Sequence, residues 1–159
     1  MRVISLLPST TEMVHALGRG VDLVGRSEEC DFPSVVRSLP VVMRARERDA
    51  ERPSAEIDAR VRASLRSGES LYTLDLERLA ELRPDLLLTQ DLCRVCSVTD
   101  AEVIDGCRKA GVAPRIVSFA PTRLEEVWAS VERLGAALGV APAGAAQGGP
   151  TQTPAAPQS

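Results

Sequence analysis

Three short polar segments hold the side chains whose chemistry suits ligand recognition. They are residues 8–12, 27–33 and 90–96, and each follows a short apolar run that is typical of a buried strand. Their hydroxyl, amide and carboxyl groups can exchange hydrogen bonds with a ligand, and Phe32 adds an aromatic ring. This chemistry favours reversible binding of a small molecule.

The first polar segment has the spacing of a helix start. Ser9 and Glu12 form a predicted capping box, so we expect a helix to begin here. Thr10 and Thr11 would then point off the first turn, where they and the free backbone N–H groups can hold a polar or anionic group. Helix capping is a sufficient explanation for Ser9 and Glu12, so the two threonines are the stronger candidates for ligand contact.

The third polar segment contains Cys93 and Cys96 in a Cys-x-x-Cys arrangement. Such a pair can be half of a zinc site, a redox pair or a coincidence, and the next helix begins too late, near Thr99, to activate a thiol. If Cys30 lies at the same edge of the fold, three thiolates are available to a soft metal. Cys107 lies on the apolar face of its own helix and is predicted to be an inert core residue.

The sequence lacks the common catalytic signatures. No Gly-x-Gly-x-x-Gly follows the first predicted strand, and neither Gly-x-x-x-x-Gly-Lys nor Gly-x-Ser-x-Gly occurs. His15 is the only histidine and is expected at the surface, so no second histidine can complete a base with its orienting partner. We therefore predict that the chain is not an enzyme and has no cofactor of its own.

Alternating apolar runs and helical patterns predict the elements that must position these segments. The predicted strands are residues 2–7, 22–25, 85–89 and 115–119, and the predicted helices are 54–67, 75–83 and 122–138, with two more that begin near residues 9 and 99. Two further capping boxes are predicted, Thr99 with Glu102 and Thr122 with Glu125.

This alternation predicts an α/β fold, a Rossmann-like doubly wound, mainly parallel sheet that forms a single lobe ending in a long helix. Ligands of such sheets bind beyond the carboxyl ends of the strands. We therefore expect the three polar segments to meet at one edge.

Length and composition favour one globular domain. The chain has 159 residues, of which 44% are apolar and 26% charged, and its net charge is −3. Its 19 basic residues are mixed with 22 acidic ones, so we expect no nucleic-acid surface. Residues 1–139 are predicted to form the lobe, and residues 140–159, rich in Ala, Gly and Pro, a disordered tail.

No apolar run is long enough to cross a bilayer, and the first residues lack the pattern of a signal peptide. As written, the chain is expected to stay in the cytoplasm.

The order of the motifs resembles the class III substrate-binding proteins of ABC transporters, in particular their cobalamin-binding branch. The matching strings are residues 2–12 (RVISLLPSTTE), 23–33 (LVGRSEECDFP) and 76–88 (LERLAELRPDLLL), and the likeness runs from about residue 2 to 138. Members of this family have two lobes joined by a long helix and hold the ligand between the lobes. The resemblance therefore implies that residues 122–138 form the connector helix and that the C-terminal lobe is missing.

The resemblance also implies a ligand, partners and contact residues. The expected ligand is cobalamin or a related corrinoid, with Phe32 packing on the flat ring, and the expected partner is an ABC transporter permease that docks through Glu102. The implied ligand contacts are Ser9, Thr10, Thr11, Asp31, Phe32, Gln90 and Asp91. The exposed side of the connector helix suggests a homodimer.

Two other functions remain open from the sequence. One is a thiol-based metal-binding or redox protein that uses Cys93 and Cys96, with Cys30 available as a third ligand. The other is a lobe that serves only as an interaction module.

Overall fold

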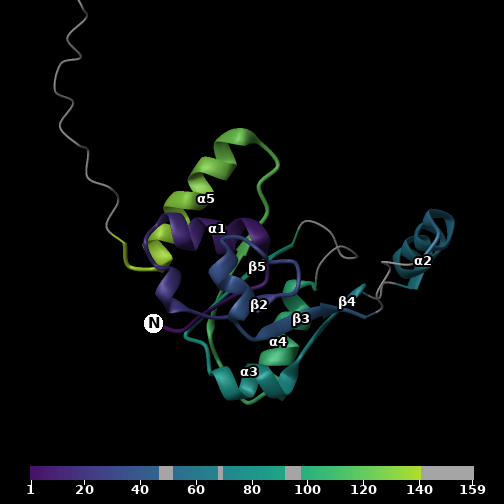
Figure 1. Cartoon of the computed structure of the whole chain (residues 1–159), viewed down its shortest axis with the longest axis horizontal. Helices are drawn as coiled ribbons and strands as arrows, with labels where there is room; N and C mark the ends of the chain where they lie inside the picture. Colours follow the sequence, from purple (N-terminus) through teal and green to yellow (C-terminus); the bar gives the residue numbers. More distant parts are fainter. Residues whose placement is uncertain (47–51, 68–69, 92–97, 141–159) are drawn as a thin grey trace, which may run out of the picture.

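A six-stranded sheet forms the centre of the fold (Figure 1). The computed structural model describes residues 1–46, 52–67, 70–91 and 98–140. The strands are β1 (Val3–Ser5), β2 (Leu23–Ser27), β3 (Val41–Ala45), β4 (Tyr72–Leu74), β5 (Leu86–Gln90) and β6 (Arg115–Phe119). Their order is β4-β3-β2-β1-β5-β6, and every neighbouring pair is parallel except β3 with β4. The predicted Rossmann-like, mainly parallel α/β sheet is therefore confirmed.

Helices cover both faces of the sheet. The described helices are α1 (Pro8–Ala16), α2 (Ser54–Ser67), α3 (Leu76–Leu82), α4 (Asp100–Lys109) and α5 (Leu124–Ala137), with two short 3₁₀ helices, η1 (Gly20–Asp22) and η2 (Ser34–Ser38). Figure 1 shows α1 and α5 on one side of the sheet and α3 and α4 on the other, while α2 stands apart at the β4 side.

Alternate residues of the strands explain the two layers. In β1, Val3 packs into the cluster shared with α1 and α5, whereas Ile4 packs into the cluster shared with α3 and α4. In β5, Leu86 and Leu87 divide in the same way, and all four side chains are at most 1% exposed. Each such buried side chain stabilises the fold by about 1.5–3 kcal/mol, which is why these strands read as continuous apolar runs.

The chain changes direction in the sheet between β1 and β5. From β1 it proceeds through β2 and β3 to β4, and then returns to the other side of β1 with β5 and β6. The loop after β1 leads to α1 on one face, and the chain after β5 leads to α4 on the opposite face. Because neighbouring connections diverge here, a crevice opens at this point, where open α/β sheets bind their ligands.

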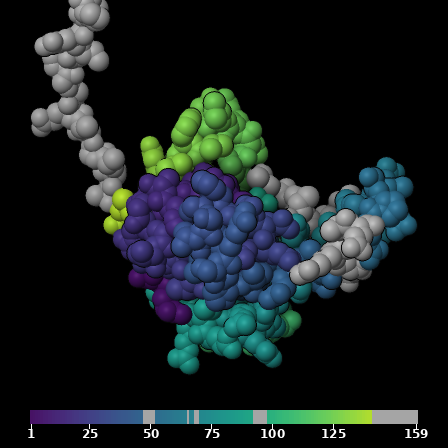
Figure 2. Space-filling view, viewed as in Figure 1, coloured from purple at the N-terminus to yellow at the C-terminus, as the bar shows by residue number. Residues whose placement is uncertain are grey.

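The last helix packs on the lobe along only half of its length. Leu134 and Leu138 are 0% and 2% exposed, but Leu124 and Trp128, near the start of α5, are 67% and 64% exposed. Figures 1 and 2 show this first half rising above the remainder of the described chain. The sequence predicted one long helix here, and only its second half is buried in this chain.

The start of α1 differs from its prediction. The helix begins at Pro8 with Leu7 as its N-cap, and no side chain caps it, so the predicted capping box of Ser9 with Glu12 is wrong. Proline suits the first helical position because its missing N–H would have no partner there, and this places Ser9 inside the first turn.

The two other predicted capping boxes had different outcomes. Thr99 with Glu102 is confirmed at the start of α4. At α5 the acidic partner is Glu126 and not Glu125, since the Glu126 carboxylate accepts the N–H of Thr122 at 2.7 Å. These hydrogen bonds to Thr122 hold the pKa of Glu126 below its ordinary value.

Two strands were missed by the sequence analysis. β3 follows Pro40 and β4 is a three-residue edge strand that runs antiparallel to β3. In the part of the chain that the structure describes, no helix is long and apolar enough to span a membrane. Apart from Val140, the predicted disordered tail (residues 140–159) lies outside the described residues, so the division at residue 139 stays a prediction.

Candidate functional site

The described parts of the three polar segments lie at one edge of the sheet. β2, β1 and β5 are parallel neighbours, so their carboxyl ends lie at the same edge, together with the end of β6. The chain continues from these ends into residues 8–12, residues 28–33, and Gln90 with Asp91. We call this edge the rim.

A small pocket opens in the rim at the point where the chain changes direction. Its volume is about 200 Å³, and it lies between the start of α1, the ends of β5 and β6, and the first half of α5. Its lining residues are Leu7, Ser9, Thr10, Met13, Gln90, Phe119, Pro121, Val127 and Ser130. This rim pocket thus brings together Ser9, Thr10 and Gln90, three of the expected ligand contacts.

The rim pocket combines polar edges with an apolar wall. Ser9 is exposed and Gln90 is half-buried, so both side chains are accessible from the rim. Ser130 donates its hydroxyl proton to the Glu126 carbonyl at 2.7 Å. Phe119, which is 3% exposed, forms the apolar part, and the guanidinium of Arg133 lies 5.2 Å from its ring centroid.

The two threonines of the first segment face inward. Thr10 and Thr11 are 1% and 0% exposed, so the prediction that they point off the first turn is wrong. The Thr10 hydroxyl lies 2.7 Å from the Ser5 hydroxyl, and the Thr11 hydroxyl lies 2.9 Å from Ser5 and 2.9 Å from the Leu7 carbonyl. These hydroxyls fasten the first turn of α1 to the end of β1, and this use inside the fold satisfies buried polar groups.

Cys30 belongs to the same buried cluster. Its side chain is 0% exposed, and the Thr11 hydroxyl lies 3.1 Å from Sγ. Burial raises the pKa of the Cys30 thiol, although its hydrogen bond with Thr11 acts in the opposite direction. Since a metal binds the thiolate, this environment disfavours the predicted role of Cys30 as a third metal ligand.

Arg26 shapes the second rim loop, and the sequence analysis missed it. Its guanidinium donates to the carbonyls of Ser27, Glu28 and Cys30 at 3.0, 3.2 and 3.1 Å, and to that of Arg37 at 3.1 Å. One side chain thereby fixes the backbone from the end of β2 to η2. The five donors of a planar guanidinium make such multiple bonding possible.

The predicted contacts Asp31 and Phe32 lie on this fixed loop. Arg37 donates to the Asp31 carbonyl at 3.0 Å and to its carboxylate at 3.2 Å, in an exposed ion pair. Phe32 is 64% exposed, an unusual position for a phenyl ring. The loop therefore presents one carboxylate and one aromatic face at the rim.

The third rim segment is described only in part. Asp91 is exposed, and the described segment ends with it. Cys93 and Cys96 lie outside the described residues, and within the described ranges no group of three His, Cys, Asp or Glu side chains could hold a metal ion. Cys107, 4% exposed, is a core residue as predicted, and burial raises the pKa of its thiol.

Glu102 lies in the first turn of α4. Its carboxylate accepts the Thr99 N–H at 2.7 Å and the Thr99 hydroxyl at 3.0 Å, which makes it the acidic half of the capping box. It is half-buried, so helix capping accounts for its position.

Comparisons with known proteins agree with this geometry. No family model matches the chain. Over 138 residues, or 87% of the chain, it is 26% identical to an uncharacterised ABC transporter substrate-binding lipoprotein, YvrC, of Bacillus subtilis (strain 168), of which it covers 34%. The chain thus spans about a third of the length of this curated relative.

Two solved structures of ligand-binding proteins are also similar to this chain. A periplasmic heme-binding protein from Pseudomonas aeruginosa matches 87% of the chain with 26% identity and a TM-score of 0.57, and the chain covers 38% of it. The periplasmic vitamin B12-binding protein BtuF of Vibrio cholerae matches 85% of the chain with 23% identity and a TM-score of 0.56, and 40% of it is covered.

These relatives are named for binding a ligand, and not for a catalysed reaction or a cofactor of their own, which agrees with the prediction of a non-enzyme. Their names also describe a lipoprotein or periplasmic proteins, so the expected cytoplasmic location finds no support. In sequence and in fold the chain resembles part of a class III substrate-binding protein of an ABC transporter.

Proposed function

We propose that the rim is one wall of a binding site for a flat tetrapyrrole-type ligand, cobalamin or a related corrinoid, in a substrate-binding protein of an ABC importer. The observation that carries the proposal is the meeting of three loops at the point where the chain changes direction in the sheet. That is the position at which open α/β sheets bind ligands.

The side chains of the rim suit such a ligand. Phe32 offers an exposed aromatic face on which a macrocycle can pack. Burying the Phe32 ring against the ligand gains apolar contact at little entropic cost. Ser9, Gln90, Asp31 and Asp91 supply hydrogen-bonding groups to the ligand's polar substituents. The backbone N–H groups at the start of α1, which has no side-chain cap, add donors for an amide or a carboxylate.

The rim pocket is too small to enclose a macrocycle. At about 200 Å³ it lies below the ~300–1,000 Å³ of common ligand sites. It therefore fits a peripheral substituent of the ligand, while the ring itself lies across the rim against Phe32. A site that is open on one side binds weakly, so we expect this chain alone to bind cobalamin with a Kd in the micromolar range or above, ~10⁻⁶ M.

The proposal is tested by titrating the chain with cyanocobalamin and following the visible spectrum and retention of the ligand on the protein. We expect saturable binding that weakens at least about fivefold in Phe32→Ala, which removes a ring contact of about 1 kcal/mol or more. Val21→Ala is the matched control, because Val21 is 93% exposed and lies in η1, before the start of β2 and away from the rim. Equal affinity of both variants, or no binding at millimolar cyanocobalamin, contradicts the proposal. Hemin in place of cyanocobalamin tests the choice of macrocycle.

Partners of the chain follow from the same proposal. We infer that an ABC permease receives the ligand and that Glu102 contributes to docking. We also infer that the exposed apolar side chains of α5, Leu124 and Trp128, are covered in the working protein, with a second copy of the chain as one candidate.

No observation on the described residues favours the alternative of a thiol-based metal or redox site, since Cys30 is a buried, protonated thiol.

A further inference from the structure

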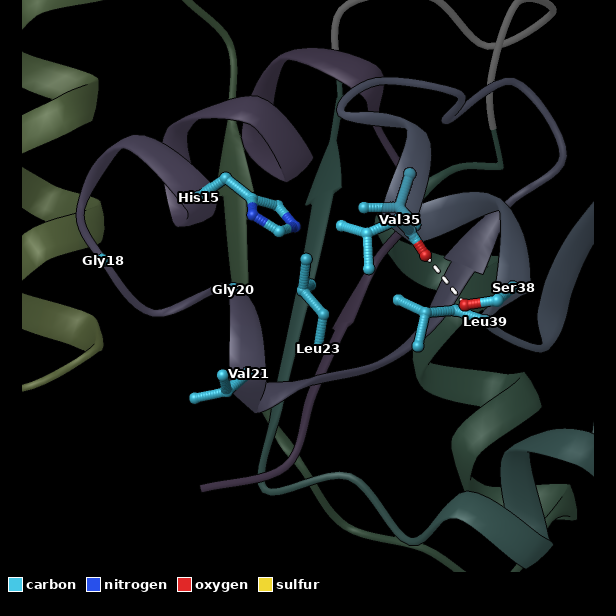
Figure 3. Close-up of a pocket in the computed structure, with 9 residues that line it drawn as sticks. His15, Gly18, Gly20, Val21, Leu23, Val35, Ser38 and Leu39 are labelled. Atoms are coloured by element: carbon cyan, nitrogen blue, oxygen red, sulfur yellow. Dashed lines mark hydrogen bonds between the residues drawn. The ribbon is translucent and has the colours of Figure 1, made fainter.

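A second pocket lies at the opposite end of the sheet from the rim. Its volume is about 570 Å³, and it is bounded by the last turn of α1, the start of β2 and η2 (Figure 3). Its lining residues include His15, Gly20, Val21, Leu23, Val35 and Leu39. Leu23 begins β2, whereas the rim lies at the carboxyl end of this strand. The pocket shares no lining residue with the rim pocket.

The wall of this pocket is mainly apolar, and its polar side chains are Ser38 and His15. The described residues that line it include no Asp, Glu, Lys or Arg. Val21 and Val35 are 93% and 62% exposed, so the pocket is flanked by apolar side chains that water covers in this chain. The Ser38 hydroxyl donates to the Val35 carbonyl at 2.8 Å, as the dashed line in Figure 3 shows, which uses its proton within the protein.

His15 supplies the second polar side chain of this pocket. Its Nε2 is buried and has no hydrogen-bond partner among the described residues, and Figure 3 shows the ring extending from α1 toward Leu23 and Val35. A buried nitrogen without a partner is unfavourable, so a bound group that can exchange a hydrogen bond with it gains free energy. Neutral imidazole nitrogens either donate or accept, and a hydroxyl can complement both forms.

Gly20 makes this position of the ring possible. A Cβ atom at residue 20 would lie 2.4 Å from His15 Cε1 and 2.4 Å from Nδ1, closer than such atoms approach in proteins. Any larger residue would therefore displace the imidazole. A substitution at residue 20 can therefore move the His15 ring without removing it.

We propose that this pocket binds a small, neutral, mainly apolar molecule that carries one hydroxyl group, which pairs with His15 Nε2. The volume lies within the ~300–1,000 Å³ typical of ligand sites, and a mainly apolar lining with a few polar groups is their usual composition. The absence of charged side chains among the described lining residues disfavours an ionic ligand. The site is independent of the rim and of the function proposed for it.

Phenol is a suitable probe, with toluene as the matched compound that lacks the hydroxyl. His15 is the only histidine of the chain, so its ring protons give one NMR signal set that needs no assignment by mutation. We expect phenol to shift these signals saturably and to bind about 2- to 10-fold more tightly than toluene, the ratio that one net hydrogen bond provides. Equal affinities of the two compounds, or no shift at millimolar phenol, overturn the proposal.

Two variants locate the site. Gly20→Ala should displace the ring and abolish the preference for phenol, and His15→Leu should do the same, with the methyl signals of Leu23 and Val35 as the readout. Ser9→Ala, in the rim pocket, should leave phenol binding unchanged. If Ser9→Ala removes phenol binding while Gly20→Ala and His15→Leu retain the phenol preference, the probe binds at the rim and the proposal fails. Because cyanocobalamin is absent from this experiment, its outcome is independent of the rim proposal.

Discussion

At the scale of single residues, the rim depends on side chains that organise loops as much as on those that face a ligand. Arg26 donates to four backbone carbonyls between Ser27 and Arg37, and in doing so holds Phe32 at the rim. The sequence could not link Arg26 to Phe32. The hydrogen bonds of Arg26 go to backbone carbonyls, which every residue carries, so no residue type in the loop indicates them.

Replacing Arg26 tests this role. Arg26→Ala leaves four carbonyls without their donor, so we expect the free energy of unfolding to fall by about 1–3 kcal/mol and cyanocobalamin binding to weaken. The matched control for stability is Arg37→Ala, which breaks an exposed ion pair with Asp31 that contributes at most about 1 kcal/mol, together with a hydrogen bond to the Asp31 carbonyl. Urea denaturation and the spectral titration measure the two effects. An Arg26→Ala protein with unchanged stability and binding contradicts the role.

Cys30 gives a prediction about pH. Burial raises its folded-state pKa above the ordinary value of 9.0, so above that pH the unfolded chain loses the proton more readily than the folded one. The folded state then binds more protons, and this contribution to stability falls as the pH rises above about 9. Urea denaturation above this pH should show that fall, and Cys30→Ala should reduce its slope even though the substitution lowers stability at neutral pH. An identical slope in the variant rules out this contribution.

At the scale of elements, the sequence was most informative where one local interaction decides the structure. β5 and β6 were predicted within one residue because continuous apolar runs suit strands that are covered on both faces. The capping box of Thr99 and Glu102 was predicted because both partners lie three residues apart. β4 was missed because it is three residues long and owes its strand conformation to pairing with β3.

The direction of the two threonines shows how a small error at a helix start propagates. The sequence analysis took Ser9 as the cap, but the cap is Leu7, two residues earlier. Each residue turns the helix by about 100°, so this difference rotates the expected directions by about 200° and brings Thr10 and Thr11 to the inside. The sequence therefore predicted that this segment lies at the rim but gave the wrong direction for two of its side chains.

The start of α4 separates a structural role of Glu102 from a role in docking. A glutamine accepts the same hydrogen bonds from Thr99 without the charge, so Glu102→Gln should keep the stability of the chain, while Glu102→Ala should lose about 0.5–2 kcal/mol. If the carboxylate also docks on a permease, Glu102→Gln should weaken that binding alone. Thermal unfolding and binding to permease in detergent provide the measurements. Permease binding that Glu102→Gln leaves unchanged contradicts the docking role.

At the scale of the whole molecule, α5 leaves an apolar surface uncovered in the part of the chain that the structure describes. Its second half packs on the lobe, but Leu124 and Trp128 are exposed, and Val127 lines the rim pocket. The helix therefore forms a wall of the proposed binding site on one side and an uncovered apolar surface on the other. This relation could not be read from the sequence, in which all the apolar residues of the helix follow one pattern.

The uncovered surface of α5 can be followed through a single fluorophore. Trp128 is the only tryptophan of the chain, so its emission reports on this surface alone. If a second copy covers α5, the emission should move to shorter wavelength as the protein concentration rises, and the sedimentation mass should double over the same range. Leu124→Gln should suppress both changes. An emission maximum and a mass that are independent of concentration exclude the homodimer.

The central claim is that loops from three separate strands form one binding surface at the rim. Hydrogen exchange of the full chain, measured by mass spectrometry with and without saturating cyanocobalamin, tests it most directly. We expect protection to rise together in residues 8–12, 28–33 and 86–91, and α3 to stay unchanged. Protection confined to the α3 and α4 face, or no change in any of the three segments while the ligand is bound, would contradict it.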